Sequence, residues 1–255
     1  MCRFVSWIGE ERYLEDLVLA PEHSLIHQSK HALICKTPVN ADGFGLAWYD
    51  NREEPCVYKD THPAWADPNL KQIAYQTKVK LFLAHVRAST GMAISRNNCH
   101  PFHVNTWSFM HNGQVGGHDK IRKELDQLVS DHYYQHRYGA TDSEAIFLIA
   151  LENNLETRPI LAMAEAVQTV EMLSRRNGTT PHMRFSACWS DGTKIYAARY
   201  ASDNLAPSLC YKKTKKGVII ASEPLDNSSE GWVNVNFNEA IIVSKENIEH
   251  KSFLK

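Results

Sequence analysis

The spacing of apolar and polar residues along the chain predicts strands near both ends and helices between them. Short apolar or alternating runs predict strands at 3–8, 42–49, 81–84, 107–110, 185–189, 194–200, 208–212, 217–221, 232–236 and 240–244. Apolar residues at helical spacing predict helices at 24–31, 68–78, 119–129, 141–154 and 159–176. Since no linker or repeat interrupts this order, we expect a single domain, residues 1–255, with two sheets and helices outside them.

Local signals sharpen the boundaries of several elements. Thr141 and Glu144 have the spacing of a capping box, which starts a helix and places Asp142 in its first turn, where the helix dipole favours a negative charge. Asp191-Gly192 predicts a hairpin. In the helix at 159–176, the positions expected to face the core are Ile160, Met163, Ala164, Val167, Val170 and Met172.

Composition and charge exclude several classes of protein. The 255 residues are 43% hydrophobic and 22% charged, with a formal net charge of −1, so no basic stripe favours nucleic acid or an anionic membrane as a partner. Charged residues interrupt the first twenty positions, and no apolar run is long enough to span a bilayer. We therefore expect a cytoplasmic protein. Its cysteines lack C-x-x-C spacing, which predicts reduced core residues and no disulfide framework or zinc site.

Cys2 is a candidate nucleophile because removal of Met1 would make it the first residue. A cysteine thiol titrates near about 8.5 and an α-amino group near about 7.7 to 8.0, so an N-terminal cysteine has a base beside its own thiol. The amine can accept the thiol proton directly or through one water. A strand beginning at Arg3 would hold this nucleophile at a sheet edge.

Two further segments each allow a structural and a functional interpretation. Arg87 follows an apolar strand, where a guanidinium needs an anion, and either an internal carboxylate or a substrate carboxylate could supply it. Asn112-Gly113 follows the strand at 107–110 and fits a hairpin turn. The same pair could also present an amide and a backbone N–H to a developing oxyanion.

Two other patterns carry less weight. His23, His27 and His31 have the spacing of one helix face, but no carboxylate completes a set of metal ligands. Cys99-His100 is not expected to form a catalytic dyad, because consecutive residues of an extended segment point to opposite sides.

Together these motifs resemble those of the class II glutamine amidotransferases. The resemblance spans essentially the whole chain and is carried, in order, by Cys2, His85-Val86-Arg87-Ala88-Ser89-Thr90, His100-Pro101, His111-Asn112-Gly113 and Thr141-Asp142-Ser143-Glu144. It implies the N-terminal-nucleophile hydrolase fold, an α+β four-layer αββα sandwich with two antiparallel sheets between helical layers.

The resemblance also implies roles for the site residues. Cys2 would attack the side-chain amide of glutamine, giving a γ-glutamyl thioester and ammonia, while Asn112 and Gly113 form the oxyanion hole. The substrate would be held by Arg87 and Thr90 at its α-carboxylate and by Asp142 at its α-ammonium group. Neither a metal nor an organic cofactor is implied.

Departures from the common pattern resemble a stand-alone branch of the family. Gly91 replaces the histidine found in glucosamine phosphate synthase, and no ammonia-consuming domain precedes Lys255. Together with Ser222-Glu223-Pro224-Leu225, these features are similar to the ergothioneine-pathway amidohydrolase and the glutathione-degradation subunit, which favours a γ-glutamyl amide or peptide as the small-molecule substrate. The alternatives are a glutaminase subunit that delivers ammonia to a separate synthetase and a non-catalytic γ-glutamyl-binding subunit.

Overall fold

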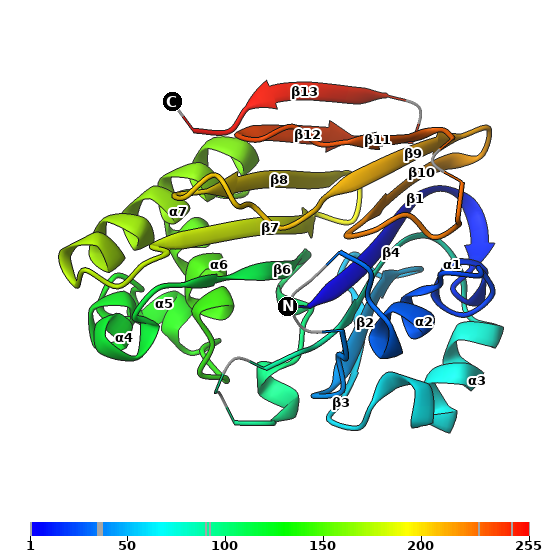
Figure 1. Cartoon of the computed structure of the whole chain (residues 1–255), viewed down its shortest axis with the longest axis horizontal. Helices are drawn as coiled ribbons and strands as arrows, with labels where there is room; N and C mark the ends of the chain where they lie inside the picture. Colours follow the sequence, from blue (N-terminus) through cyan, green and yellow to red (C-terminus); the bar gives the residue numbers. More distant parts are fainter. Residues whose placement is uncertain are drawn as a thin grey trace.

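Two antiparallel sheets face one another in the computed structural model, which describes residues 2–34, 38–89, 91, 93–228, 230–245 and 247–254 (Figure 1). The first sheet has the order β11 (Trp232–Asn234), β9 (Cys210–Thr214), β10 (Gly217–Ala221), β1 (Arg3–Tyr13), β4 (Lys78–Val86), β2 (Phe44–Tyr49) and β3 (Cys56–Asp60). The second has the order β13 (Ile248–Ser252), β12 (Glu239–Val243), β8 (Ile195–Ala201), β7 (Met183–Ser190), β6 (Trp107–Val115) and β5 (Phe102–Val104).

Helices cover the outer face of each sheet. The first sheet carries α1 (Glu15–Val18), α2 (Leu25–Lys30) and α3 (Pro68–Gln76), and the second carries α4 (His118–Gln127), α5 (Asp131–Tyr134), α6 (Asp142–Glu152) and α7 (Pro159–Arg176). Two 3-10 turns, η1 (Ala64–Ala66) and η2 (Arg96–Asn98), lie in the connections.

Buried apolar side chains form three layers, one between the sheets and one under each set of helices. In β1, Phe4 and Ile8 face the layer between the sheets, whereas Val5 and Trp7 face the helices. This alternation is what a strand buried on both faces requires. The four-layer arrangement of helices, sheet, sheet and helices confirms the predicted α+β fold.

Most predicted elements are confirmed, and those that were missed have little apolar signal. The helix Pro159–Arg176 and the strand Gly217–Ala221 have their predicted bounds, and β7 and β8 form the hairpin at Asp191-Gly192. The sequence did not reveal α5, which has only four residues, or β3, β5 and β13, which are short and lie at sheet edges. Edge strands keep polar side chains and therefore lack a clear apolar alternation.

Three local expectations were wrong. Met172 was placed in the core, but it is 50% exposed on α7. The capping box is only half formed, because Thr141 accepts from the Glu144 backbone N–H while the Glu144 carboxylate turns to Arg137 and Gly139. The chain also makes no turn at Asn112-Gly113, since β6 continues to Val115.

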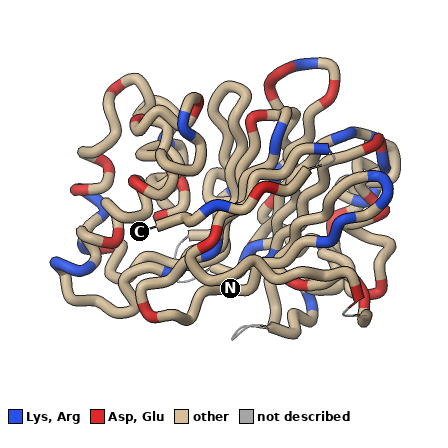
Figure 2. The backbone as a smooth tube through the Cα atoms, turned by 90° about the horizontal axis from the view of Figure 1, so that it is seen from above, with Lys and Arg blue, Asp and Glu red and all other residues tan. Residues whose placement is uncertain are grey.

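Charge is spread over the whole molecule. Basic and acidic residues are interspersed along the described backbone in Figure 2. None of the described helices combines the length and the apolar character that crossing a membrane requires.

Candidate active site

Cys2 lies at the start of β1, on the side that faces the second sheet. Phe4 packs in the layer between the sheets, and Ser6 reaches Cys188 of the second sheet at 3.4 Å between Oγ and Sγ. Because side chains alternate along an extended chain, Cys2 faces this same layer. Its Sγ lies 3.7 Å from the carbonyl oxygen of Ala88, just beyond β4, and its side chain is half-buried.

The surroundings of Cys2 keep its thiol protonated. Burial raises the pKa of the Cys2 thiol above its ordinary value, while the contact with Ala88 and the charges of Arg87 and Arg3 oppose that rise. A thiol of raised pKa is a poor nucleophile until a base removes its proton. To act as a nucleophile, Cys2 would need a general base close to Sγ.

A buried ion pair anchors the strand that carries Cys2. Arg3 Nε lies 2.6 Å from Glu223 Oε1, although its N–H is not aligned for a hydrogen bond, and both side chains are fully buried. The same guanidinium donates to the carbonyl oxygens of Cys2 at 2.8 Å and Ile34 at 2.6 Å. Arg3 therefore links the nucleophile to a loop 31 residues further along the chain.

Glu223 completes this anchor from the segment after β10. It accepts hydrogen bonds from the backbone N–H groups of Leu33 (3.0 Å) and Ile34 (2.9 Å) and contacts His23 Nε2 at 3.1 Å. Burial alone would raise the pKa of the Glu223 carboxyl, but Arg3 and these hydrogen bonds outweigh burial and lower it. The sequence shows Glu223 only as part of the Ser222-Glu223-Pro224-Leu225 motif. Its pairing with Arg3 could not be predicted, because its partners lie about 190 to 220 residues away along the chain.

Arg87 is a buried cation with no anionic partner among the described residues. It follows β4, is 4% exposed, and donates to the carbonyl oxygen of Asp42 at 3.4 Å and to Ser89 Oγ at 3.3 Å. Among the described residues, no carboxylate forms an ion pair with Arg87, and the Asp42 carboxylate accepts from the Ser89 backbone N–H instead. The guanidinium is thus able to bind a carboxylate that comes from outside this part of the chain.

Asn112 is a buried amide in the layer between the sheets. It lies in β6, two residues after Met110, which packs between the sheets, so the Asn112 side chain faces the layer that Cys2 also faces. Asn112 is fully buried, and neither Oδ1 nor Nδ2 has a hydrogen-bond partner in the part of the chain that the structure describes. An unsatisfied buried amide costs about 1 to 3 kcal/mol of stability, which points to a ligand or a reaction intermediate as its partner.

The backbone N–H of Gly113 points away from β7. Val115, two residues further along β6, donates its N–H to Asp142 Oδ2 at 2.9 Å instead of to a strand. Since N–H groups two residues apart point to the same side of a strand, that of Gly113 leaves the same edge. A side chain at this position would collide with the carbonyl oxygen of Arg184, so only glycine fits here.

Asp142 begins α6 and lies beside this edge. Its Oδ2 accepts from Val115 and its Oδ1 accepts from the backbone N–H of Ser143 at 2.7 Å. A carboxylate accepts about four hydrogen bonds, so Asp142 retains capacity for an ammonium group. Thr90, the other predicted binding residue, and Met1 lie outside the described residues.

Three buried histidines lie near the site, and none of them forms an ion pair with a described residue. His85 and His100 lie with their ring centroids 4.2 Å apart, and His85 Nε2 donates to the carbonyl oxygen of His111 at 3.4 Å, which joins the two sheets. Burial lowers the pKa of His85 to about 3 and lowers those of His100 and His111 as well. All three are therefore neutral at pH 7.

These histidines predict loss of stability in mild acid. The unfolded chain protonates them below about pH 6.5 and the folded chain does not, so stability is full above that pH and falls toward about pH 3, by up to about 1.4 kcal/mol per pH unit for each histidine. Urea unfolding at pH 7.0 and 5.5 measures this loss. His100→Leu should reduce the slope, because it removes a buried imidazole whose pKa burial lowers. A slope that His100→Leu does not change would contradict the assignment.

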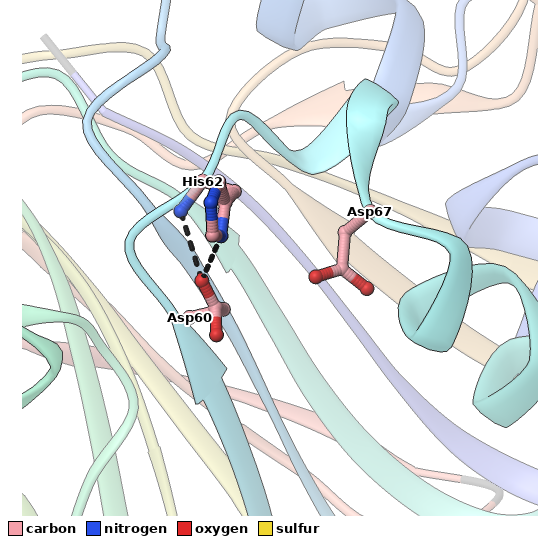
Figure 3. A group of neighbouring side chains, drawn as sticks. All are labelled: Asp60, His62 and Asp67. Carbon is pink, nitrogen blue, oxygen red and sulfur yellow. Dashed lines mark hydrogen bonds and ion pairs between the residues drawn. The ribbon is translucent and has the colours of Figure 1, made fainter.

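Asp60, His62 and Asp67 form a cluster of metal-ligand type, but their carboxylates already have other partners (Figure 3). Asp60 accepts from the backbone N–H and Nδ1 of His62 and forms an ion pair with Arg96 at 2.6 Å. Asp67 caps α3 by accepting from the Leu70 N–H. The cluster is therefore explained by structural contacts.

The other two candidate patterns also have structural explanations. His23 contacts Glu223, so the His23, His27 and His31 set is not free to bind a metal. Cys99 Sγ donates to backbone carbonyls of Asp60 and Ser95 rather than to a histidine, so it forms no dyad with His100.

Comparison with known proteins places the chain in a family. Residues 27–211 match the model of the class-II glutamine amidotransferases. The chain is 30% identical to the probable glutamine amidotransferase DUG3 of Saccharomyces cerevisiae, over 97% of this chain and 83% of that protein. It is 28% identical to the gamma-glutamyl-hercynylcysteine sulfoxide hydrolase of Mycolicibacterium smegmatis, over 92% of each.

A solved structure agrees along the full length. The glutamine aminotransferase class-II domain protein from Silicibacter pomeroyi is 39% identical to this chain and has a TM-score of 0.81. The match covers 100% of both chains. These similarities agree with the four-layer fold. The chain belongs to the class II glutamine amidotransferases.

Proposed function

We propose that this protein hydrolyses the γ-amide bond of a γ-glutamyl compound through a thioester on Cys2. The Cys2 sulfur attacks the γ-carbonyl carbon, the C–N bond breaks, and the amine leaves with a proton. Water then attacks the thioester carbon, which releases the γ-carboxylate and restores the thiol. The observation that carries this proposal is the buried guanidinium of Arg87, which pairs with no carboxylate among the described residues and precedes Ala88, whose carbonyl oxygen contacts the Cys2 thiol.

The charges around Cys2 match a zwitterionic amino acid. Arg87, with Thr90, would bind the α-carboxylate, and Asp142 would bind the α-ammonium group. With both ends of the substrate head group held, the γ-carbonyl is directed toward Cys2, which lowers the entropic cost of the attack.

The oxyanion of the tetrahedral intermediate would be held by Asn112 Nδ2 and the Gly113 backbone N–H. Within the described residues, Asn112 Nδ2 has no hydrogen-bond partner and the Gly113 N–H points away from β7, so neither donor must break a hydrogen bond to those residues to act. Preorganised donors of this kind typically contribute about 2.7 to 4 kcal/mol each to transition-state stabilisation.

The general base in this proposal is the α-amino group of Cys2 after removal of Met1. The raised pKa of the Cys2 thiol makes such a base necessary. An amine that titrates below about 8 can accept the thiol proton at neutral pH and return it to the leaving amine.

Similarity to a gamma-glutamyl-hercynylcysteine sulfoxide hydrolase favours a γ-glutamyl compound larger than glutamine as the substrate. We retain delivery of ammonia to a separate synthetase as a secondary possibility, and a non-catalytic binding subunit is less favoured because the relatives are named as enzymes. Cytoplasmic location and a single domain over 1–255 remain predictions.

Substitution of Arg87 tests this function. Arg87→Met should lower kcat/KM for glutamine and γ-glutamyl amides by about 100-fold or more, because charge-assisted hydrogen bonds to a carboxylate contribute about 1.5 to 3 kcal/mol each. Arg87→Lys should recover only part of this loss, since lysine lacks the planar pair of donors. Steady-state kinetics measure both.

A substrate without the α-carboxylate provides the control. Cleavage of 4-aminobutanamide should be equally slow in the unaltered enzyme and in Arg87→Met. Substitution of an exposed arginine, Arg176→Met, should leave the cleavage rate of both substrates unchanged. If Arg87→Met impaired both amides to the same extent, Arg87 would not be the carboxylate-binding residue.

A further inference from the structure

A cavity of about 240 Å³ opens between β3, β5, η2 and the start of α6. None of the five described site residues lines it. Its polar and charged lining includes Lys59, Arg96, Asn97, His103, His136 and Glu144. The cavity is therefore separate from the proposed hydrolytic site and has its own set of charged groups.

Lys59 places a half-buried ammonium group in this cavity. Its Nζ lies 5.0 Å from the centre of the Phe102 ring, and its side chain is half-buried. Within the described part of the chain, no carboxylate forms an ion pair with it. Burial lowers the pKa of the Lys59 ammonium to about 8. Desolvating a charge without pairing it is unfavourable, and an anion in the cavity would offset that cost.

The one carboxylate of the lining, Glu144, forms its ion pair with Arg137 and none with Lys59 within the described residues. Glu144 accepts from Arg137 at 2.7 Å, from the Gly139 N–H at 2.9 Å and from the Tyr138 N–H at 3.3 Å. It favours the charged form of Lys59 only at longer range, without a direct contact. The remaining lining is rich in donors, because Arg96 uses one nitrogen on Asp60 and keeps most of its guanidinium exposed.

We propose that this cavity binds a small oxyanion, a carboxylate or a phosphate. Lys59 Nζ would provide the central charge, with Arg96 and the imidazoles of His103 and His136 as further donors. The volume suits an anion of a few heavy atoms, and the apolar wall formed by Phe102 and Phe147 strengthens the electrostatic attraction by excluding water.

Titration calorimetry with phosphate, acetate and sulfate, at constant ionic strength set with chloride, tests this site. At least one oxyanion should bind with one-to-one stoichiometry. Whether phosphate or acetate binds more tightly identifies the natural ligand as a phosphate or a carboxylate. Lys59→Met, which keeps the length of the side chain, should weaken binding at least tenfold. Lys80→Met removes an exposed lysine of β4 and should leave affinity unchanged. Equal affinity in Lys59→Met, or no binding above chloride, would overturn the proposal.

The unaltered protein offers a second test that does not depend on the folding of a variant. Charged and titratable groups that face Lys59 or line its cavity are Arg96, Cys99, His103, His136, Tyr138 and Glu144. Burial lowers the pKa of His103 and raises that of Cys99 to about 11, so Lys59 is the group that loses its charge between pH 7 and 9.5. Sulfate affinity should therefore fall severalfold over this range. A constant affinity would contradict a role for Lys59.

Discussion

Replacing Cys2 with alanine is expected to lower kcat for γ-glutamyl amide hydrolysis by about 10⁴-fold or more, the order of loss seen when a nucleophile is removed. The proposed reaction passes through a bond to Sγ, and no other described cysteine could replace it, since Cys99, Cys188 and Cys210 are buried and Cys56 is on an edge strand. Binding of γ-glutamyl ligands should persist, because Arg87 and Asp142 are unchanged.

Kinetics should be combined with intact-protein mass after incubation with a glutamine-like diazoketone. The processed enzyme should gain one label at Cys2, and excess γ-glutamyl substrate should block it. Cys56→Ala, which removes an exposed thiol, is the matched control and should retain both activity and labelling. Turnover that survives in Cys2→Ala would reject the thioester mechanism. A label on Cys56 would show that the reagent reacts with any exposed thiol rather than with a catalytic one.

Removal of the Glu223 carboxylate is expected to have the largest effect on stability. Glu223→Ala should lower the free energy of unfolding by about 3 to 5 kcal/mol, because it leaves the fully buried Arg3 guanidinium without its anion. The same change frees the backbone N–H groups of Leu33 and Ile34. Urea unfolding at pH 7 measures the loss.

Two comparisons separate the ion pair from general effects of mutation. Glu124→Ala breaks an exposed pair with Arg176 at 3.8 Å and should cost less than about 1 kcal/mol. The double variant Arg3→Met with Glu223→Leu should recover most of the stability, since matched apolar groups can replace a buried pair. It should not recover activity, because Arg3 also holds the Cys2 carbonyl. Recovery of full activity would show that this anchor does not position the nucleophile.

Much of the fold could be predicted from local pattern. Strands buried on both faces, such as β10, and long helices with a clear apolar face, such as α7, have a strong signal in their own residues. β3 and β13 have no such signal, because each lies at a sheet edge with one side unpaired and keeps polar side chains. Asn112-Gly113 was misleading for another reason: the pair prefers turns in isolation, and the ladder between β6 and β7 overrides that preference.

For this protein, the sequence by itself determined which residue types are available for chemistry: a cysteine at position 2, an arginine after an apolar strand, and an Asn-Gly pair. Only the tertiary structure decided what those residues face. Whether Arg87 meets an internal carboxylate, whether Asn112 lies in a turn or between sheets, and which acid neutralises Arg3 all depend on contacts between distant segments. Such contacts follow from the pairing and stacking of two sheets, and that arrangement is a property of the whole chain rather than of any local stretch.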